Sequence, residues 1–195
     1  LRGPQSALYG SNALGGVISI TTKSATKPGV EFGAEAEGGT DETGAGQVYG
    51  RAKDDRGSIS FSAAFRRNGG FDVSGDPDGE DDEDRNLTLN GKGEYDLTDW
   101  MSVGGTLRFT DRESDFDQFN FGAADRDGLI TDRDDGVEVR DLIGSAYAKA
   151  DTFGGKLAHR LQVNHNRNDV EARTAGAQSS DSTGTRTAVK YQGTV

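Results

Sequence analysis

The chain has 195 residues, of which 28% are charged and 32% are hydrophobic, and its formal net charge is −11. This acidic balance argues against nucleic-acid binding, which needs a basic surface, and no stretch approaches the roughly 18 consecutive apolar residues of a membrane helix. Cysteine is absent, which excludes disulfides and thiolate metal sites. Membrane-spanning strands are still allowed, because they need only alternate residues to be apolar.

The opening segment, LRGPQSALYGSNALGGVISITTK, does not alternate and carries closely spaced glycines. Pro4 suits the start of a short helical turn and Gly10 suits its end. Gly15 and Gly16 precede a β-branched run, and adjacent glycines allow a close backbone approach or a positive φ. The residues alone therefore predict a small α+β segment that ends in a strand.

From about residue 30 onward, apolar and polar side chains alternate. Successive side chains of a strand point to opposite faces, so this pattern predicts strands with one apolar and one polar face. The alternation is clearest over residues 59–65, 87–97 and 101–109. Weaker alternation predicts five further strands, at 30–38, 47–53, 142–150, 157–167 and 185–195.

The predicted connections alternate in length. Segments 54–57, 98–99 and 153–155 are short and contain the Asp and Gly residues of tight turns. Segments 68–84, 114–139 and 173–184 are long and polar, and 39–44 is intermediate. Bacterial outer-membrane barrels have this asymmetry. Aromatic residues near the predicted strand ends fit membrane-interface belts, although aromatics favour strands in general: Phe65, Phe71, Tyr95, Trp100, Phe109 and Phe153.

The opening segment resembles the end of the plug domain of TonB-dependent outer-membrane receptors. The matching residues are Arg2, Gly3, Pro4, Leu8, Tyr9, Gly10, Ala13, Gly15, Gly16, Val17, Ile18, Thr22 and Lys23. Ser19 stands where asparagine is commoner in that family. The resemblance implies that residues 1–27 are the C-terminal end of an α+β plug domain and that residues 28–195 are the N-terminal strands of the barrel.

The fold class expected from this resemblance is all-β, a fragment with about eight of the 22 strands of a transmembrane antiparallel β-barrel. The remaining plug, the TonB-contacting segment and the signal peptide are expected outside the fragment. The resemblance implies active transport across the bacterial outer membrane of a scarce ligand, such as cobalamin or a ferric siderophore, with a vitamin B12-type ligand slightly favoured. The implied partners are TonB, outer-membrane lipid and lipopolysaccharide.

Two of the predicted long loops are rich in acids. Clustered carboxylates supply the six to eight oxygen ligands that Ca²⁺ prefers, although neither DPDG (76–79) nor DRDG (125–128) completes an EF-hand. A solvated acidic loop explains the same residues equally well, and divalent bridging to lipopolysaccharide is a third alternative. The candidate calcium ligands are Asp76, Asp78, Asp82, Asp125, Asp127, Asp132 and Asp134.

Two classes of function stay open. The first is the transporter, and the alternative is an extracellular calcium-dependent β-rich adhesin. The alternating loop lengths and the opening motif favour the transporter. The sequence has no Cys, two His and no Gly-x-Ser-x-Gly elbow, so it offers no clear nucleophile and base for an enzyme. No cofactor is required by this interpretation.

Overall fold

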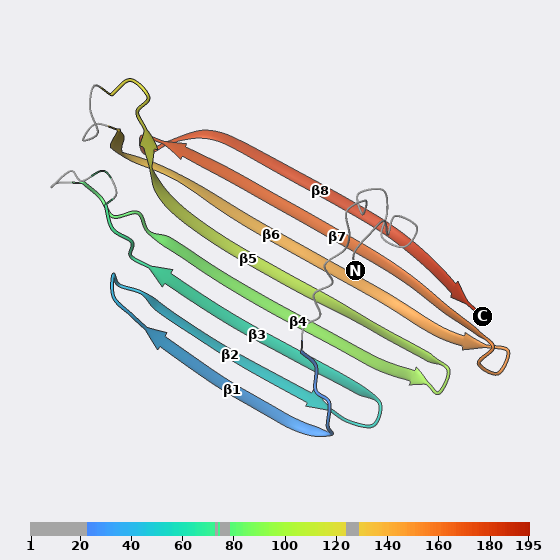
Figure 1. Ribbon diagram of the computed structural model, residues 1–195. Coiled ribbons are helices and arrows are strands. Elements are labelled where there is room, and N and C mark those ends of the chain that lie inside the picture. The colour runs from blue at the N-terminus through green and yellow to red at the C-terminus, as the bar shows by residue number, and fades with distance from the viewer. Residues whose placement is uncertain (1–22, 73, 75–78, 124–128) are drawn as a thin grey trace.

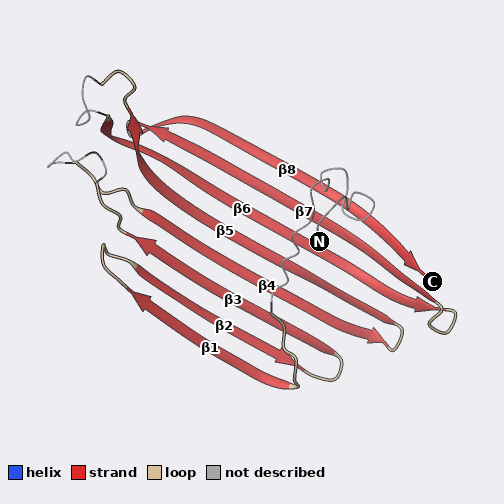
Figure 2. Cartoon of the chain, in the orientation of Figure 1, coloured by secondary structure: helices blue, strands red, loops and turns tan. Residues whose placement is uncertain are grey.

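The structure is a computed structural model, and it describes residues 23–72, 74, 79–123 and 129–195. In these residues the chain forms one sheet of eight antiparallel strands, in which each strand pairs with the next along the sequence (Figure 1). The described part contains strands, turns and loops but no helix (Figure 2), and therefore no helix that could cross a membrane. The all-β prediction is confirmed.

All eight predicted strands are present. Their bounds are β1 Gly29–Gly38, β2 Gly44–Lys53, β3 Gly57–Asn68, β4 Asp84–Thr98, β5 Met101–Phe119, β6 Ile130–Thr152, β7 Leu157–Thr174 and β8 Ala177–Thr194. β1 and β8 form the two edges of the sheet. The motif residues of the opening segment lie outside the described residues: Arg2, Gly3, Pro4, Leu8, Tyr9, Gly10, Gly15 and Gly16.

The strand register confirms that the sheet has one apolar and one polar face. A single row of paired residues crosses all eight strands and is uncharged throughout: Val30, Ala52, Ile59, Gly93, Gly105, Ala146, Val163 and Val189. We call the face that carries this row the apolar face. The neighbouring residues in each strand point to the opposite side, which we call the polar face.

The apolar face is exposed. Its large side chains include Phe32, which is 84% exposed, Phe61 at 59% and Leu107 at 54%. No side chain among the described residues is both large and fully buried. The described sheet therefore has no hydrophobic core of its own, and its apolar face needs another apolar surrounding.

The short connections lie together at one end of the sheet, as predicted, and we call this the short-turn end. Between β2 and β3, the Asp54 side chain accepts hydrogen bonds from the backbone N–H of Arg56 (2.9 Å) and of Gly57 (2.7 Å). Only two residues join β4 to β5, and four residues join β6 to β7. An Asp side chain that bonds its own backbone two residues on is a usual way to close such turns.

The opposite end, which we call the long-loop end, corrects two predictions. The predicted loop 114–139 is wrong, because β5 continues to Phe119 and β6 begins at Ile130. The predicted loop 173–184 is also wrong, because β7 and β8 meet in a two-residue turn of Ala175 (φ 50°) and Gly176 (φ 70°). In these stretches polar residues occur on both faces and apolar residues such as Phe116 and Phe119 are isolated, so the alternation disappears although backbone pairing continues. The long connection predicted between β3 and β4 is confirmed in its ends, because β3 ends at Asn68 and β4 begins at Asp84.

Candidate metal centre

Carboxylates from three segments meet at the long-loop end of the sheet. Asp72 belongs to the β3–β4 loop, Asp117 lies near the end of β5 and Asp132 lies near the start of β6. Each is half-buried and offers one oxygen, and these oxygens lie within 4.8 Å of one another. We call these three residues the aspartate triad.

The loop around Asp72 is shaped by local hydrogen bonds. The Asp72 Oδ1 atom accepts from the backbone N–H of Ser74 at 2.7 Å and from its hydroxyl at 2.6 Å. The Asp72 N–H donates to the Asp81 carboxylate at 3.1 Å. A Cβ atom at Gly79 would lie 2.6 Å from Asp72 Oδ2 and 3.2 Å from Asp132 Cγ, so the glycine lets the loop approach the triad.

Asp117 is positioned by an irregularity in the β5–β6 pairing. The register shifts between Phe116 and Gln118, so Asp117 falls at the shift. Such bulges re-aim a side chain relative to its neighbours in the strand. The backbone N–H of Arg133 donates to Asp117 Oδ1 at 3.1 Å and holds the carboxylate across the strand pair.

Two oxygens of the aspartate triad have no donor. Asp117 Oδ2 and Asp132 Oδ1 are buried and have no hydrogen-bond partner among the described residues. An unpaired carboxylate oxygen away from water is unfavourable, because it loses hydration without a replacement. A bound cation would satisfy both atoms.

The carboxylates around the triad lie close together and repel one another. Burial, followed by the charges of Asp117 and Asp72, raises the pKa of Asp82 above its ordinary value of 3.8. The pKa of Glu80 is raised from 4.5 by desolvation and then by the charges of Asp132 and Asp134. The triad therefore lies in a region of negative potential.

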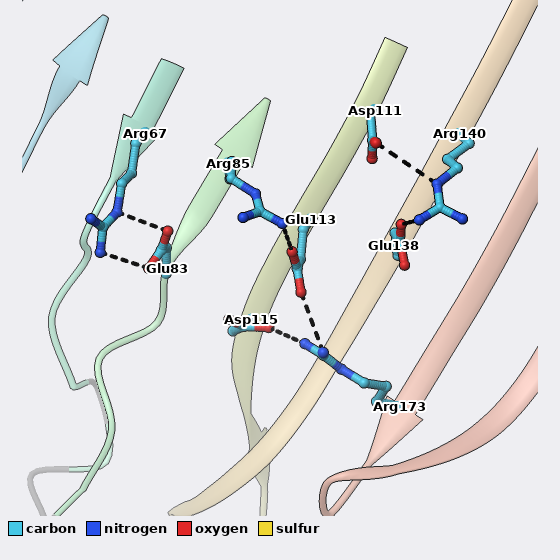
Figure 3. A network of polar contacts seen from close by, with 9 residues as sticks. All are labelled: Arg67, Glu83, Arg85, Asp111, Glu113, Asp115, Glu138, Arg140 and Arg173. Carbon is cyan, nitrogen blue, oxygen red and sulfur yellow. Dashed lines mark hydrogen bonds and ion pairs between the residues drawn. The ribbon is translucent and has the colours of Figure 1, made fainter. Parts of the chain in front are cut away.

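Arg133, the neighbour of Asp132 in the sequence, and Arg173 are both engaged by other carboxylates. Arg133 makes two bonds with Asp135, at 2.8 and 2.6 Å, and Asp135 is only 2% exposed. Arg173 contacts Asp115 at 2.8 Å and Glu113 at 3.3 Å (Figure 3). Asp135 is therefore structural, and among the described residues both arginines are paired with carboxylates outside the triad.

The structure brings together part of the predicted ligand set. Asp132 belongs to the triad and Asp82 borders it, whereas the exposed Asp134 directs its carboxylate toward Gly176. Asp76, Asp78, Asp125 and Asp127 lie outside the described residues. Sequence reasoning missed Asp72 and Asp117 as ligands. The serine two residues after Asp72 signals a local side-chain turn, but no sequence pattern marks the register shift at Asp117.

The geometry of the triad fits a hard divalent cation. Ca²⁺ binds oxygen at about 2.3–2.6 Å, so two ligand oxygens on opposite sides of one ion are about 4.6–5.2 Å apart. The three triad oxygens all lie within 4.8 Å of one another, so one ion can contact all three of them. Three carboxylates fill only part of a calcium coordination shell, so water or further loop oxygens would complete it.

Neither the scan against protein-family models nor the search of curated proteins finds a match for this chain. The described residues form an all-β protein with one exposed apolar face and an acidic cluster at the long-loop end of its sheet.

Proposed function

We propose that this chain is part of a TonB-dependent transporter of the bacterial outer membrane. In this proposal residues 1–27 end the plug, residues 28–195 supply the first barrel strands, and the ligand is cobalamin or a ferric siderophore. The resemblance of the opening segment supports the family, and the eight-stranded antiparallel sheet in sequence order supports the architecture.

One observation carries the proposal, and it is the position of the first charged residue of each strand on the apolar face. We call the line through these residues the charged boundary. Going from the short-turn end, the first charged residue is Arg67 on β3 and its partner Arg85 on β4. On β5 and β6 it is the pair Asp111 and Arg140, which lies one row nearer the short-turn end. On β7 the first charged residue is Arg167, which lies one row nearer the short-turn end than Arg140 on β6. β8 carries threonines at these levels and does not mark the boundary.

The shift of this boundary corresponds to a uniform strand tilt. Two rows equal four residues, or about 13 Å along a strand, and β3 and β7 are separated by four spacings, or about 19 Å. The boundary is therefore inclined to the perpendicular of the strands by about 35°, which agrees with the roughly 35–45° tilt of outer-membrane strands. A flat membrane surface crossing tilted strands produces such a boundary.

The height of the apolar band agrees as well. On β5 the band runs from Met101 to Phe109, which is eight steps or about 26 Å along the strand. At a tilt of about 35° it rises about 22 Å, close to the roughly 25 Å band of such barrels. Trp100, which is 54% exposed, and Phe153, which is 78% exposed, lie in turns at the short-turn end, where interfacial aromatics are expected.

We further propose that Ca²⁺ orders the long-loop end through the aspartate triad. The proposal is supported by the two buried oxygens without a donor and by the spacing of the three carboxylates. Bound Ca²⁺ would join the β3–β4 loop to the ends of β5 and β6, and so fix the loops that lie on the ligand side of the transporter.

The transport proposal is tested by uptake. A strain that lacks the full-length protein should lose accumulation of either labelled cobalamin or one labelled ferric siderophore, and complementation should restore it. The ligand that is lost identifies the substrate. Unchanged uptake of both ligand classes would reject transport of these substrates.

The second candidate is the calcium-dependent adhesin, which the aspartate triad would suit equally well. Cell fractionation separates the two, because a transporter is recovered with the outer membrane and an adhesin of this kind in the secreted soluble fraction. Recovery in the secreted fraction would favour the adhesin and contradict the lipid-facing role of the apolar face.

A further inference from the structure

A cavity lies on the polar face, where β2, β3 and β4 are neighbours in the sheet. Its volume is about 310 Å³, and we call it the polar-face cavity. Lys23, from the segment that precedes β1, also lines it. Two rows of the register supply most of its other polar side chains, Arg51, Ser60 and Lys92 in one row and Tyr49, Ser62 and Asn90 in the next.

The polar-face cavity is basic, although the whole chain carries a net charge of −11. Its charged lining residues among those described are the three cations Lys23, Arg51 and Lys92 and one carboxylate, Glu35. Glu31 lies 3.5 Å from Arg51 and offsets part of its charge. The cations still outnumber the acids when Glu31 is included, so the local potential favours an anionic ligand.

Lys92 has a charge that the described residues do not neutralise by direct contact. It is half-buried on β4, and within the described part of the chain it makes no ion pair or hydrogen bond. Its charge influences Glu94, but Glu94 is bonded by Tyr147 and, at 2.9 Å, by Lys149. A half-buried ammonium loses hydration, and without a counter-ion nothing replaces it. A bound anion would supply that counter-ion.

Ser60 is a second polar group in the cavity that lacks a partner. The residue is only 8% exposed, and its hydroxyl makes no hydrogen bond with the residues that the structure describes. Buried polar side chains are normally hydrogen-bonded. Because Ser60 lies between Arg51 and Lys92 in the register, its hydroxyl can donate to an anion that these two cations hold.

Arg51 is held in place but keeps donors for a ligand. Its guanidinium carbon lies 4.6 Å from the centroid of the Tyr49 ring, and its Nη1 contacts Glu31 at 3.5 Å. The side chain is only 18% exposed. A guanidinium has five N–H donors, so these contacts leave donors that can bind a carboxylate or phosphate in a bidentate fashion.

The size of the polar-face cavity limits the ligand. Pockets for drug-sized molecules have volumes of about 300–1,000 Å³, and this cavity lies at the lower end of that range. Cobalamin and ferric siderophores are too large for it. The ligand is therefore a small molecule, different from the ligands that we propose for transport.

We propose that the polar-face cavity binds a small organic anion with a phosphate or carboxylate group, through Lys23, Arg51, Lys92 and the Ser60 hydroxyl. Lys23 belongs to the segment before β1, whereas the other three residues belong to β2, β3 and β4. The bound anion therefore fastens that segment to the polar face of the sheet. The site is separate from the aspartate triad, and it does not depend on the transport proposal.

The test is isothermal titration of the full-length protein, purified in a neutral detergent, with 3-phosphoglycerate, with inorganic phosphate and with glycerol as the neutral probe. The K92Q variant removes the charge without a counter-ion, K92R keeps a positive charge there, and S60A removes the hydroxyl. K53Q is the matched control, because Lys53 lies on the polar face of β2 but does not line the cavity.

We expect K92Q to bind 3-phosphoglycerate about tenfold more weakly than the wild type, because a contact between two charged groups is lost. S60A should bind it several-fold more weakly, and K92R and K53Q should bind it nearly as well as the wild type. Inorganic phosphate should bind more weakly than 3-phosphoglycerate, and glycerol should not bind. Without ligand, K92Q and S60A should unfold at the temperature of the wild type, since neither side chain bonds another described residue.

Amide hydrogen exchange gives a second measurement. Residues 24–28 should exchange more slowly when 3-phosphoglycerate is present, and unchanged exchange would overturn the fastening of this segment. Absence of binding of both anions by the wild type, or equal weakening by K92Q and K53Q, would overturn the site. Equal binding of inorganic phosphate and 3-phosphoglycerate would overturn the organic anion as the ligand. None of these results bears on uptake, which tests the transport proposal by itself.

Discussion

At the scale of single residues, the most informative atoms are the two buried oxygens without a donor in the aspartate triad. Asp117 Oδ2 and Asp132 Oδ1 lie where the pKa of the neighbouring Asp82 is already raised by burial and by like charges. Carboxylate oxygens near a protein surface usually face water, whereas these two are buried without a hydrogen-bond partner. Their arrangement is unfavourable without a cation and favourable with one.

Removing the charge of either Asp117 or Asp132 should therefore weaken calcium binding. We expect Asp117→Asn and Asp132→Asn each to lower Ca²⁺ affinity by about tenfold or more, because each removes one charged ligand. Isothermal titration of the full-length protein with Ca²⁺ measures this. Asp55→Asn is the matched control, since Asp55 is exposed at the short-turn end. Unchanged affinity in both triad variants would exclude the triad as the site.

The raised pKa of Asp82 also predicts a dependence on pH. A carboxyl group whose pKa is raised in the folded state contributes its stability below the ordinary value of 3.8, and that contribution is lost as the pH rises through the folded pKa. Without metal, the β3–β4 loop should thus become less protected as the pH rises from about 4 to 7.

Ca²⁺ should reverse this loss, because it binds the deprotonated carboxylates. Amide hydrogen exchange of residues 79–83 at the two pH values, with EDTA or with Ca²⁺, measures the effect after correction for the intrinsic pH dependence of exchange. Equal corrected protection at both pH values in EDTA would contradict the predicted charge repulsion.

At the scale of elements, we expect the two-residue turn between β7 and β8 to be important for the formation of β8. Ala175 and Gly176 both have positive φ, as a type I′-like hairpin turn requires, and Gly176 suits this conformation better than any other residue. β8 is the edge strand of the described sheet and is mostly exposed, so few side-chain contacts support it if the turn fails.

Gly176→Ala should therefore loosen β8 specifically. We expect a cost of about 1–2 kcal/mol, because a Cβ atom is unfavourable at this φ, and it would also lie 2.9 Å from the Asp134 carboxylate. Amide exchange of β8 in the full-length protein reports the loss. Gly184→Ala is the control within β8, since the nearest neighbour of its new Cβ atom would be Asn168 O at an ordinary 3.9 Å. A similar effect of the two substitutions would argue against the turn as the cause.

At the scale of the whole molecule, the two faces of the sheet require different surroundings. The apolar face presents exposed aliphatic and aromatic side chains over all eight strands, and its charged border is inclined by about 35° to the perpendicular of the strands. Lipid in contact with this face and water or a polar plug in contact with the other would satisfy both.

A charge in the middle of the apolar band should therefore prevent membrane assembly. We expect Leu107→Arg to cost about 2–4 kcal/mol in the membrane-embedded state and to reduce the folded protein recovered from the outer membrane. Thr106→Arg introduces the same charge one residue away, on the polar face, and should be tolerated. If both variants are recovered equally, the apolar face does not contact lipid.

Much of the fold could be predicted from local pattern. Segments 59–65, 87–97 and 101–109 alternate clearly because one of their faces is apolar and the other polar, and all three lie within the strands β3, β4 and β5. The extensions of β5 to Phe119 and of β8 back to Ala177 could not be predicted. Polar residues occur on both faces of the sheet there, without a regular alternation, and hydrogen bonds to the neighbouring strand keep these residues extended.

The sequence predicted an acidic cation site in this part of the chain, but it did not predict all of the residues that form the site. The density of acids in the β3–β4 and β5–β6 connections indicated carboxylates near the loops, and Asp132 and Asp82 were among the candidates. Asp72 and Asp117 join them because a glycine lets the loop approach and a register shift turns a strand residue inward. These two causes act between segments that are distant in sequence.

The sequence by itself determined which side chains share a face and where the short turns fall, because both follow from the two-residue period of a strand and from local turn chemistry. Only the tertiary structure decided the register between strands. That register sets the inclined border of the apolar face, places Arg51, Ser60 and Lys92 in one row and brings three aspartates from separate segments within 4.8 Å. Pairing between strands is non-local, so no single segment encodes it.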